Sequence, residues 1–576
     1  MKKLLQYMKG YEKQCVLGPL FKLLEATFEL LIPLVVAQIV DVAIADGDRG
    51  YAAKMCFVMI LLGVIGLVCA VTAQYFAARA AVGFAGRLRH AVMRHILGLS
   101  YTQIDTLGTS TMITRMTSDI NQVQNGVNLT LRLLLRSPFV VFGAMIMAFT
   151  IDAQAAIVFV DLIVLLCVVV FGIMLITMPM YKKVQASLDK VTASTRENLA
   201  GVRVLRAFCK EKSETAEFER ETGELVDRQV AAGRISALLN PLTFVIVNLA
   251  VVFLIQIGAI KVDGGVLTQG LVIALYNYMS QILVELIKMA NLIVSMTKAV
   301  ACAGRVAAVL EIQPAEEKGN INPQTLRGKV EFRDVEARYE GAAESALERI
   351  SFTAHPGQTI GVIGGTGSGK STLVNLIPGL YRAFGGQVLI DDVDVREYDA
   401  EALRQKIGMV PQKSVLFKGT IHSNLLWGRG DAPDADLWQA LEIAQAREVV
   451  KSKEGELDAP VSQNGANFSG GQRQRLAIAR ALVRKPAILI LDDSASALDY
   501  ATDAQLRLAI RRMPNAPTTF IVSQRAASVR YADQILVLDD GELVGHGTHE
   551  ALLAGCKIYQ EIYYSQFPKE VTDNGR

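Results

Sequence analysis

The sequence predicts a membrane domain of six long transmembrane helices fused to an α/β domain that carries a P-loop. Three observations support this fold class. The first half of the 576-residue chain holds long apolar stretches without charge, a short polar segment follows, and the remainder alternates strand-like and helix-like patterns. A chain of this length that is 51% hydrophobic, with its apolar residues so unevenly placed, is too long for one domain.

Six segments are long enough to cross about 30 Å of hydrocarbon as helices. Four contain charge-free runs, at 55–73, 162–180, 235–260 and 266–284. Two others are accepted despite internal charges, which are Lys22, Glu25 and Glu29 in the first span and Arg132 and Arg136 in the third. The expected spans are about 14–42, 52–78, 127–151, 154–180, 235–261 and 266–290.

Basic residues are concentrated on one side of the expected bilayer. They crowd the N-terminus and the stretches near 79–115 and 182–234, whereas the expected outer loops hold few, such as Arg49 and Lys261. The positive-inside rule therefore predicts a multi-pass protein of the cell membrane with both termini in the cytoplasm. The net charge of +3 is small for this size and indicates no nucleic-acid partner. The seven cysteines show no pairing or metal-ligand spacing.

Two inner connections, 79–126 and 181–234, keep helical periodicity well beyond the length of a span. The helices should therefore continue into the cytoplasm and end in short turns that can touch another domain. The membrane domain is expected to cover 1–312, and a polar linker at 313–327 follows it. The α/β domain then occupies 328–576.

A P-loop pattern lies between the strand-like segment 359–363 and a helix-like segment that begins at Thr372. Its backbone N–H groups should curl around phosphates, Lys370 should neutralise phosphate oxygens, and Ser371 should offer a hydroxyl to Mg²⁺. Asp492, at the end of the aliphatic strand 487–491, is the expected magnesium partner. The motif consists of Gly364, Gly365, Thr366, Gly367, Ser368, Gly369, Lys370 and Ser371.

The presence of the P-loop suggests nucleotide-binding roles for two further residues. Tyr339 precedes it, and its ring could stack on adenine, although a half-buried strand tyrosine would be the interpretation without that motif. Gln412 follows Pro411, a pairing that usually marks a turn, but here it could sense magnesium and the attacking water.

The most specific motif comes later in the chain. A serine, two glycines and a glutamine open a helix between the P-loop and the aliphatic strand, as Ser469, Gly470, Gly471 and Gln472. This arrangement resembles the signature of ABC ATPases. The resemblance implies that Ser469 and the glycine amides face the γ-phosphate of ATP held on the P-loop of a second subunit, so ATP and Mg²⁺ are the implied cofactors.

The resemblance covers nearly the whole chain, since six spans fused to one cassette look like an exporter-type half-transporter. Arg196–Gly201 and Arg206–Phe208 resemble the second cytoplasmic loop region of that family, and Arg115 and Asp119 resemble the first. Soluble cassette proteins such as those of DNA repair lack these spans. The implied partners are a second half-transporter, membrane lipid and a small amphipathic substrate.

The chain departs from the family pattern at two positions. Asp493 stands where the family usually has a catalytic glutamate, and Gln524 stands where it has a histidine. The aspartate draws the carboxylate back by about 1.5 Å, and a misplaced base can forfeit roughly 10²- to 10⁴-fold in rate. Gln524 can still donate a hydrogen bond to a γ-phosphate but cannot carry a proton.

These departures predict the slow-site subunit of a heterodimeric exporter, and the Asp492–Asp499 run strengthens this interpretation. The partner would then have an intact glutamate and histidine, and the signature of this chain would complete the partner's site. A homodimer whose aspartate suffices is the alternative assembly. The alternative functions are a regulatory ATP-binding subunit and an importer built on the exporter fold.

Charged residues within the spans require a partner or a cavity. Glu25 and Glu29 lie one turn apart in the first span, Arg132 and Arg136 in the third, and Glu285 and Lys288 in the sixth. One interpretation is ion pairing between helices. The other is a substrate cavity for cationic amphiphiles, with Glu25, Glu29, Arg136 and Glu285 as its candidate residues.

Overall fold

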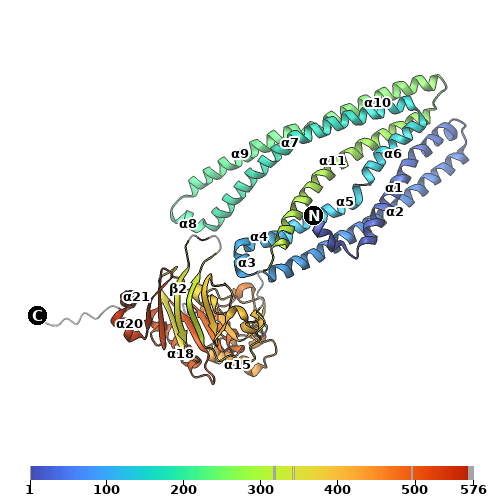
Figure 1. Cartoon of the computed structure of the whole chain (residues 1–576). Coiled ribbons are helices and arrows are strands. Elements are labelled where there is room, and N and C mark those ends of the chain that lie inside the picture. Colours follow the sequence, from blue (N-terminus) through green and yellow to red (C-terminus); the bar gives the residue numbers. More distant parts are fainter. Residues whose placement is uncertain (1, 315–318, 340–341, 343, 495–496, 568–576) are drawn as a thin grey trace. The chain divides into compact units, whose positions relative to one another are not determined.

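The computed structural model describes residues 2–314, 319–339, 342, 344–494 and 497–567 (Figure 1). Two compact units divide the chain. The first comprises residues 1–97 and 110–312, and the second comprises 98–109 and 313–576. The short segment between the second and third spans therefore belongs to the second unit by its contacts, although it lies within the first half of the sequence.

The first unit is built from long helices, and six helical segments of the described chain are long and apolar enough to cross a membrane, which confirms the predicted number. These segments are Glu12–Ile44, Arg49–Leu97, Thr109–Ile151, Ala153–Ala200, Glu211–Asp263 and Gln269–Glu311. Their helices are α1 (Glu12–Gln38), α2 (Arg49–Leu97), α4 (Thr109–Thr114), α5 (Ile120–Leu133), α6 (Arg136–Ile151), α7 (Ala153–Ala200), α9 (Glu211–Ala237), α10 (Leu239–Asp263) and α11 (Gln269–Glu311), with short elements η1 (Lys2–Met8), η2 (Ile39–Ile44), η3 (Arg115–Asp119) and α8 (Val202–Ala207).

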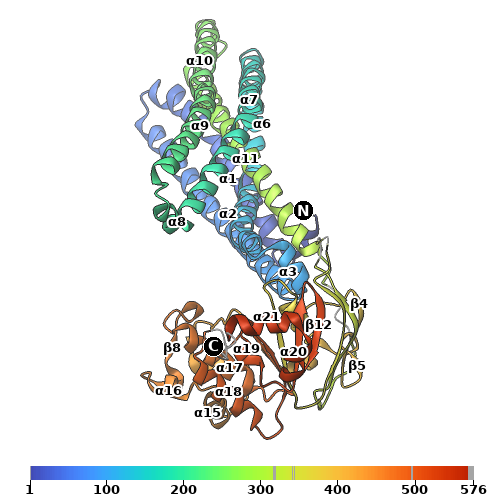
Figure 2. The same cartoon turned by 90° about the vertical axis from the view of Figure 1, so that its left-hand side faces the viewer.

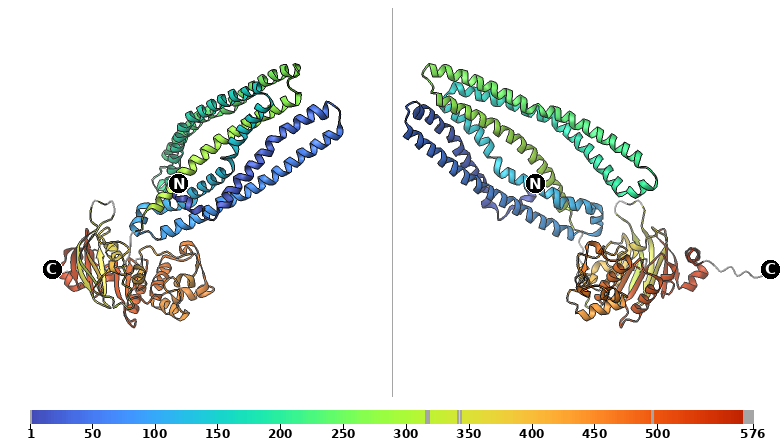
Figure 3. Two further views of the ribbon diagram at one scale, coloured as in Figure 1. Left: turned by 45° about the vertical axis from the view of Figure 1, so that its right-hand side comes forward. Right: turned by 180° about the vertical axis from the view of Figure 1, so that it is seen from behind.

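Small residues let α1 and α2 approach closely. Ala73, Ala77, Ala80 and Ala81 on α2 are buried, and a Cβ added to Gly18 of α1 would lie 3.5 Å from the backbone nitrogen of Ala77. Close backbone packing through small side chains is a main source of association between helices in lipid. Another set of long helices also runs side by side. Figure 3 shows α7 beside α9 and α10, with the α7–α9 pair ending at α8.

The third span is interrupted between Leu133 and Arg136, where α5 ends and α6 begins. Pro138 explains the break, because its nitrogen cannot donate to the carbonyl of Leu134 and its ring crowds that carbonyl. Arg132 and Arg136 therefore lie on two different helices. They are not a one-turn pair on a single helix, as the sequence spacing predicted.

The second unit contains two principal sheets. The larger has the order β12-β11-β3-β10-β9-β6, and all its neighbouring pairs are parallel except β11 with β12. The smaller is antiparallel, with the order β2-β1-β4-β5. The strands are β1 (Val330–Ala337), β2 (Leu347–Ala354), β3 (Thr359–Gly364), β4 (Gly385–Ile390), β5 (Val393–Asp394), β6 (Ile407–Val410), β9 (Ile488–Asp492), β10 (Thr518–Val522), β11 (Gln534–Asp539) and β12 (Glu542–Gly547), and β7 (Gly419–Thr420) pairs with β8 (Pro460–Val461).

Some helices of this unit pack against the parallel sheet, and others form a separate helical part. Figure 2 shows α15, α16 and α17 on one side of this unit and β4 and β5 on the opposite side. The helices of the unit are α3 (Tyr101–Leu107), α12 (Lys370–Leu376), α13 (Ala400–Gln405), α14 (Ile421–Leu425), α15 (Asp434–Ile443), α16 (Arg447–Lys451), α17 (Gly470–Val483), α18 (Tyr500–Arg511), α19 (Ala526–Val529), α20 (His549–Gly555) and α21 (Lys557–Gln566), with η4 (Val395–Glu397), η5 (Glu456–Asp458) and η6 (Gln463–Gly465).

Parallel strands at the centre of the large sheet are buried on both faces. Every residue of β9 and β10 is buried, which explains their nearly continuous apolar sequence. The strands β3, β10, β9 and β6 lie side by side in parallel, so their carboxyl ends meet at one edge. That edge is where open α/β sheets bind ligands.

Candidate nucleotide-binding site

The P-loop follows β3 at the carboxyl edge of the sheet and leads into α12, as the sequence predicted. Gly367 and Gly369 have φ values of +86° and +89°, which favour glycine. A Cβ on Gly364 would lie 2.1 Å from the carbonyl oxygen of Leu538, so only glycine fits there. The loop backbone is thus shaped by close approach and by left-handed turns, as a phosphate cradle requires.

Lys370 points back into this loop. Its Nζ donates to the carbonyl oxygens of Gly364, at 3.0 Å, and of Gly365. The side chain is buried, and burial lowers the pKa of Lys370, an effect that the charges of Asp493 and Asp492 oppose. A cation held inside the loop is correctly placed to meet phosphate oxygens.

Ser371 and Asp492 meet across the strand edge. Ser371 Oγ donates a hydrogen bond of 3.0 Å to Asp492 Oδ1. Burial raises the pKa of Asp492, and the bond from Ser371 opposes that rise. A hydroxyl and a carboxylate oxygen at this separation are hard donors of the kind that Mg²⁺ takes, so the residues present fit a magnesium ion shared with phosphate.

Asp493 follows β9 in an uncommon backbone conformation, with φ of +45°. Its carboxylate is hydrogen bonded by Gln412, which follows β6, and its backbone N–H donates to the Val522 carbonyl at 3.0 Å. Burial raises the pKa of Asp493, whereas the Gln412 bond and the positive charges of Arg525 and Lys370 lower it. Asp493 is therefore fixed at the end of β9 through both its backbone N–H and its carboxylate.

Gln524 follows β10 and has an exposed side chain. Its carbonyl accepts a 2.8 Å hydrogen bond from Gln566 Nε2 near the end of α21. Ser523 precedes it, and its backbone N–H donates to the Val362 carbonyl at 3.0 Å. The backbone at this position is fixed while the amide side chain remains accessible.

Tyr339 lines a cavity together with the P-loop residues and is 40% exposed. Its hydroxyl forms a 2.9 Å hydrogen bond with the hydroxyl of Thr372 on α12. The ring therefore has one end anchored to the helix that follows the P-loop, and an exposed surface that a base could cover.

One cavity of about 300 Å³ gathers most of the predicted site residues. Four strand ends contribute to it, and its lining includes Tyr339, Thr366, Gly367, Gly369, Lys370, Ser371, Thr372, Gln412, Asp492, Asp493 and Gln524. Ala346, Val522 and Ser523 line it as well and were not predicted. Ser523 had a sequence signal, since it begins the Ser-Gln-Arg segment after an aliphatic strand.

The signature residues lie at the N-terminus of α17 and are not among the residues that line this cavity. Ser469 Oγ accepts from the Gln472 backbone N–H at 3.3 Å, and Gln472 Oε1 accepts from the Ser469 N–H at 3.0 Å. This capping box fixes the helix start, and Ser469 and Gly470 are exposed. A Cβ on Gly471 would lie 2.9 Å from the Ala497 carbonyl oxygen, which explains the second glycine.

Gln474 is a contributor that sequence reasoning missed. Its Nε2 donates to the Asp493 carbonyl at 3.3 Å, and its Oε1 accepts from the Ala497 N–H at 3.2 Å. It therefore links α17 to the chain on both sides of residues 495 and 496, which belong to the Asp492–Asp499 run and lie outside the described residues. Gln474 lies within the signature segment 467–475, but the sequence alone assigned it no role.

Arg136 gathers three carboxylates of the membrane spans, those of Glu25, Glu29 and Glu285, into one network. Arg136 is buried and donates to Glu285 and to Glu29 Oε2, the latter at 2.6 Å, while Glu25 lies 3.9 Å away. Ser137 also donates to Glu285, at 2.8 Å. The four predicted cavity residues thus come together from α1, α6 and α11.

Comparison with known proteins agrees with this architecture. The family model described as "ABC transporter transmembrane region" matches residues 15–286, and the model described as "ABC transporter" matches 347–496. The chain is 38% identical over 570 residues to an uncharacterized ABC transporter ATP-binding protein of Mycobacterium tuberculosis, which covers 97% of each chain.

More distant relatives carry functional names. A lipid A-core flippase of Vibrio vulnificus is 29% identical over 84% of this chain and 83% of its own. A putative multidrug export protein of Bacillus subtilis is 28% identical over 98% of this chain and 99% of its own. The solved structure of a bacterial Atm1-family ABC exporter with ATP bound superposes with a TM-score of 0.80 at 22% identity, over 98% of this chain and 100% of the other.

Glycine substitutions test the shape of the loop. Gly369→Ala should lower ATP affinity at least about tenfold, because its φ is +89° and the new Cβ would lie 2.5 Å from the Ala346 carbonyl oxygen. Gly365→Ala is the matched control, since no atom lies within 4 Å of its added Cβ. Equilibrium binding of a fluorescent ATP analogue measures both. Equal losses in the two variants would contradict this account of the cradle.

Proposed function

The chain belongs to the ABC transporter family as an exporter-type half-transporter with its own ATPase domain, and on that premise we propose that it is the slow-site subunit of a heterodimeric exporter. It would export amphipathic or hydrophobic compounds such as drugs, lipids or peptides. Its own site would hold ATP and hydrolyse it slowly, and its signature would complete the competent site of a partner that has glutamate and histidine at the two variant positions.

The observation that carries this proposal is the pairing of a complete phosphate cradle with Asp493 and Gln524 in one cavity. The elements that bind phosphate and magnesium are in place, so affinity for ATP should be ordinary. The Asp493 carboxylate accepts a hydrogen bond from Gln412, and its side chain is one methylene shorter than that of a glutamate, so it extends less far toward the phosphates. Binding and hydrolysis should therefore be separated in this chain.

The exposed start of α17 supports the second half of the proposal. Ser469 and Gly470 face solvent at a helix N-terminus, where backbone N–H groups and the helix dipole favour a phosphate. The cavity of this chain has a P-loop but no lining residue from the signature among the described residues. A second subunit is the natural source of the missing γ-phosphate contacts at each site.

Ser371 and Asp492 would hold Mg²⁺, and Gln412, which lines the same cavity, would contribute to the same site. The ion supplies charge neutralisation to the β- and γ-phosphates when it is bound.

We further propose a cell-membrane location with both termini in the cytoplasm, because the basic residues gather on the inner side of the spans. The names of the flippase and the multidrug protein support an amphipathic substrate.

Two other functions remain as candidates. A regulatory ATP-binding subunit would share the slow site, and an importer would share the exporter fold. Transport assays with both chains separate the importer from the exporter, because only an exporter moves substrate away from the side on which ATP is hydrolysed.

Restoring the usual residues tests the slow site. Asp493→Glu combined with Gln524→His should raise ATP turnover of the purified chain by roughly 10²-fold, because it returns a carboxylate of full reach and a proton-bearing side chain. Two copies of the chain can supply each other's signature in this experiment. Steady-state phosphate release measures the gain, and Lys370→Ala in the same background should abolish it. Equally vigorous hydrolysis by the unaltered chain would sink the proposal.

Glu29 is our proposed contact for cationic substrates, because it is the most exposed carboxylate around Arg136, at 38% against 16% for Glu25 and 3% for Glu285. Glu29→Gln should weaken stimulation of ATPase by cationic amphiphiles and spare basal ATPase and neutral substrates. Arg136 would keep Glu285, so thermal stability should stay nearly unchanged.

Glu285→Gln is the matched comparison, and it should destabilise the protein because Glu285 is buried with Arg136, Ser137 and Lys288 as partners. If Glu29→Gln lowers thermal stability as much as Glu285→Gln does and leaves the stimulation by cationic amphiphiles unchanged, Glu29 is structural and its proposed role toward substrate is wrong.

A further inference from the structure

A line of side-chain contacts in the second unit connects α3 to the nucleotide cavity through Tyr381. Tyr381 stands after α12, and its hydroxyl donates a 2.7 Å hydrogen bond to Asp105 Oδ2 on α3. On its other side its ring makes an edge-to-face contact with Tyr339, with centroids 5.4 Å apart and planes at 82°. Tyr339 continues the line to Thr372 beside the P-loop.

The contacts of Tyr339 define what holds its ring. One end is fixed by the hydroxyl bond to Thr372, and one side is fixed by the Tyr381 ring. Edge-to-face aromatic pairs have a preferred geometry and stabilise it beyond the area that they bury. The hydroxyl bond fixes one end of the long axis of the ring, and the edge-to-face contact with Tyr381 restricts rotation of the ring about that axis. The plane of Tyr339 decides whether it can stack on adenine, so Tyr381 sets a condition for that contact.

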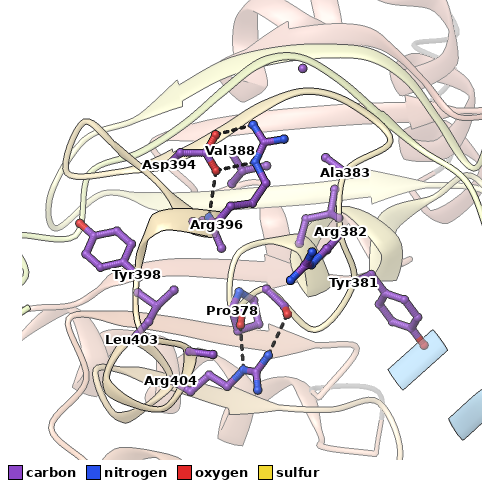
Figure 4. A pocket seen from close by; sticks show the side chains of 15 residues that line it. Pro378, Tyr381, Arg382, Ala383, Val388, Asp394, Arg396, Tyr398, Leu403 and Arg404 are labelled. Atoms are coloured by element: carbon purple, nitrogen blue, oxygen red, sulfur yellow. Dashed lines mark hydrogen bonds and ion pairs between the residues drawn. The ribbon is translucent and has the colours of Figure 1, made fainter. Parts of the chain in front are cut away.

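The α3 side of Tyr381 is equally specific. Besides the Asp105 bond, its ring packs edge-on against Tyr101, with centroids 6.0 Å apart. Figure 4 shows the Tyr381 hydroxyl turned outward from the pocket that Pro378, Arg404 and Tyr398 also line. Burial raises the pKa of Tyr381 and the bond to Asp105 adds to the rise. The phenol therefore stays protonated and keeps donating to the carboxylate.

The helix α3, which accepts the hydrogen bond from Tyr381, is itself held in place by further hydrogen bonds. Ser100 and Gln103 form a capping box at its start, and Gln103 Nε2 donates to the Gln313 carbonyl at 2.7 Å. The helix is also continuous in sequence with the second and third spans, which end at Leu97 and begin at Thr109. The helix α3 is therefore the part of the second unit that lies in the sequence between these two spans.

We propose that Tyr381 is a positioning residue that holds Tyr339 in place for adenine and links occupancy of the nucleotide cavity to α3 through Asp105. The inference rests on the proposed role of Tyr339 in ATP binding. Packing alone would need the ring of Tyr381 but not its hydroxyl. The two parts of the side chain thus have separable roles, with the ring acting on Tyr339 and the hydroxyl acting on α3.

The experiment uses the full-length chain in lipid nanodiscs and two readouts. The first is the affinity for ATP and for inorganic triphosphate, both measured by displacement of a fluorescent ATP analogue. The second is hydrogen–deuterium exchange of residues 98–109 with and without ATP. Tyr381→Leu should lower affinity for ATP by about 2- to 10-fold and leave that for triphosphate unchanged, because only the adenine contact is disturbed.

ATP should slow exchange of 98–109 in the unaltered chain, and absence of that effect would overturn the link to α3. Tyr381→Phe should keep both affinities but lose the slowing, and Asp105→Asn should behave in the same way. Tyr398→Phe is the matched control, because it removes a buried hydroxyl bond, to the Ile390 carbonyl, from the same pocket without touching Tyr339. It should change neither readout.

Equal losses of ATP and triphosphate affinity in Tyr381→Leu would overturn the inference, since they indicate general damage to the site. So would an ATP effect on 98–109 that survives in Tyr381→Phe. Tyr339→Leu separates this inference from its premise. If that variant leaves the ratio of the two affinities unchanged, Tyr339 does not contact adenine, and the premise fails; if the ratio falls while Tyr381→Leu has no effect, only the inference fails.

Discussion

The site depends on four parallel strands ending at one edge of a buried sheet. Because β3, β10, β9 and β6 are neighbours in that order, the P-loop, Gln524, the two aspartates and Gln412 are brought together although they are far apart in sequence. The hydrogen bond between Ser371 and Asp492 joins the helix after β3 to the end of β9, two strands away. Burial of those strands on both faces gives this edge its rigidity.

A rigid edge also makes small changes costly. An aspartate at position 493 cannot regain the reach of a glutamate by shifting its backbone, since its N–H is bound to the Val522 carbonyl. On our proposal, a change of one methylene group thus lowers the rate of hydrolysis and leaves nucleotide affinity intact. The signature at the N-terminus of α17 is also held rigidly, by its capping box and by the hydrogen bond from Gln474. In the proposed dimer, its phosphate contacts serve the other subunit.

The membrane helices follow a different constraint, because charge within them must be paired. Arg136 collects carboxylates from α1 and α11, at sequence separations of 107 and 149 residues. This network orders three helices around one guanidinium. It also leaves Glu29 as the partly exposed member, which is the reason to test it for contact with substrate.

Local motifs explain what could be predicted from sequence. The P-loop, the aliphatic strand before Asp492 and the helix-opening Ser469 each need only neighbouring residues, so the fold class and most of the cavity-lining residues followed from the printed chain, whereas Ala346, Val522 and Ser523 did not. Contacts between distant segments carry no such local pattern. The partners of Arg136, the role of Gln474, and the grouping of 98–109 with the ATPase domain required the structure. The break before Arg136 had a signal in Pro138, but apolar periodicity masked it.

The central claim is that this chain holds ATP without cleaving it at an appreciable rate. The most direct measurement is the chemical state of the nucleotide bound to this chain during turnover of the assembled transporter. The complex is mixed with MgATP labelled in the adenine, and the reaction is quenched at intervals shorter and longer than one turnover. The nucleotide crosslinked to each subunit is then identified as ATP or ADP. The account predicts that this subunit retains mostly ATP over many turnovers while its partner accumulates ADP. Predominant ADP on this subunit within one turnover would contradict it.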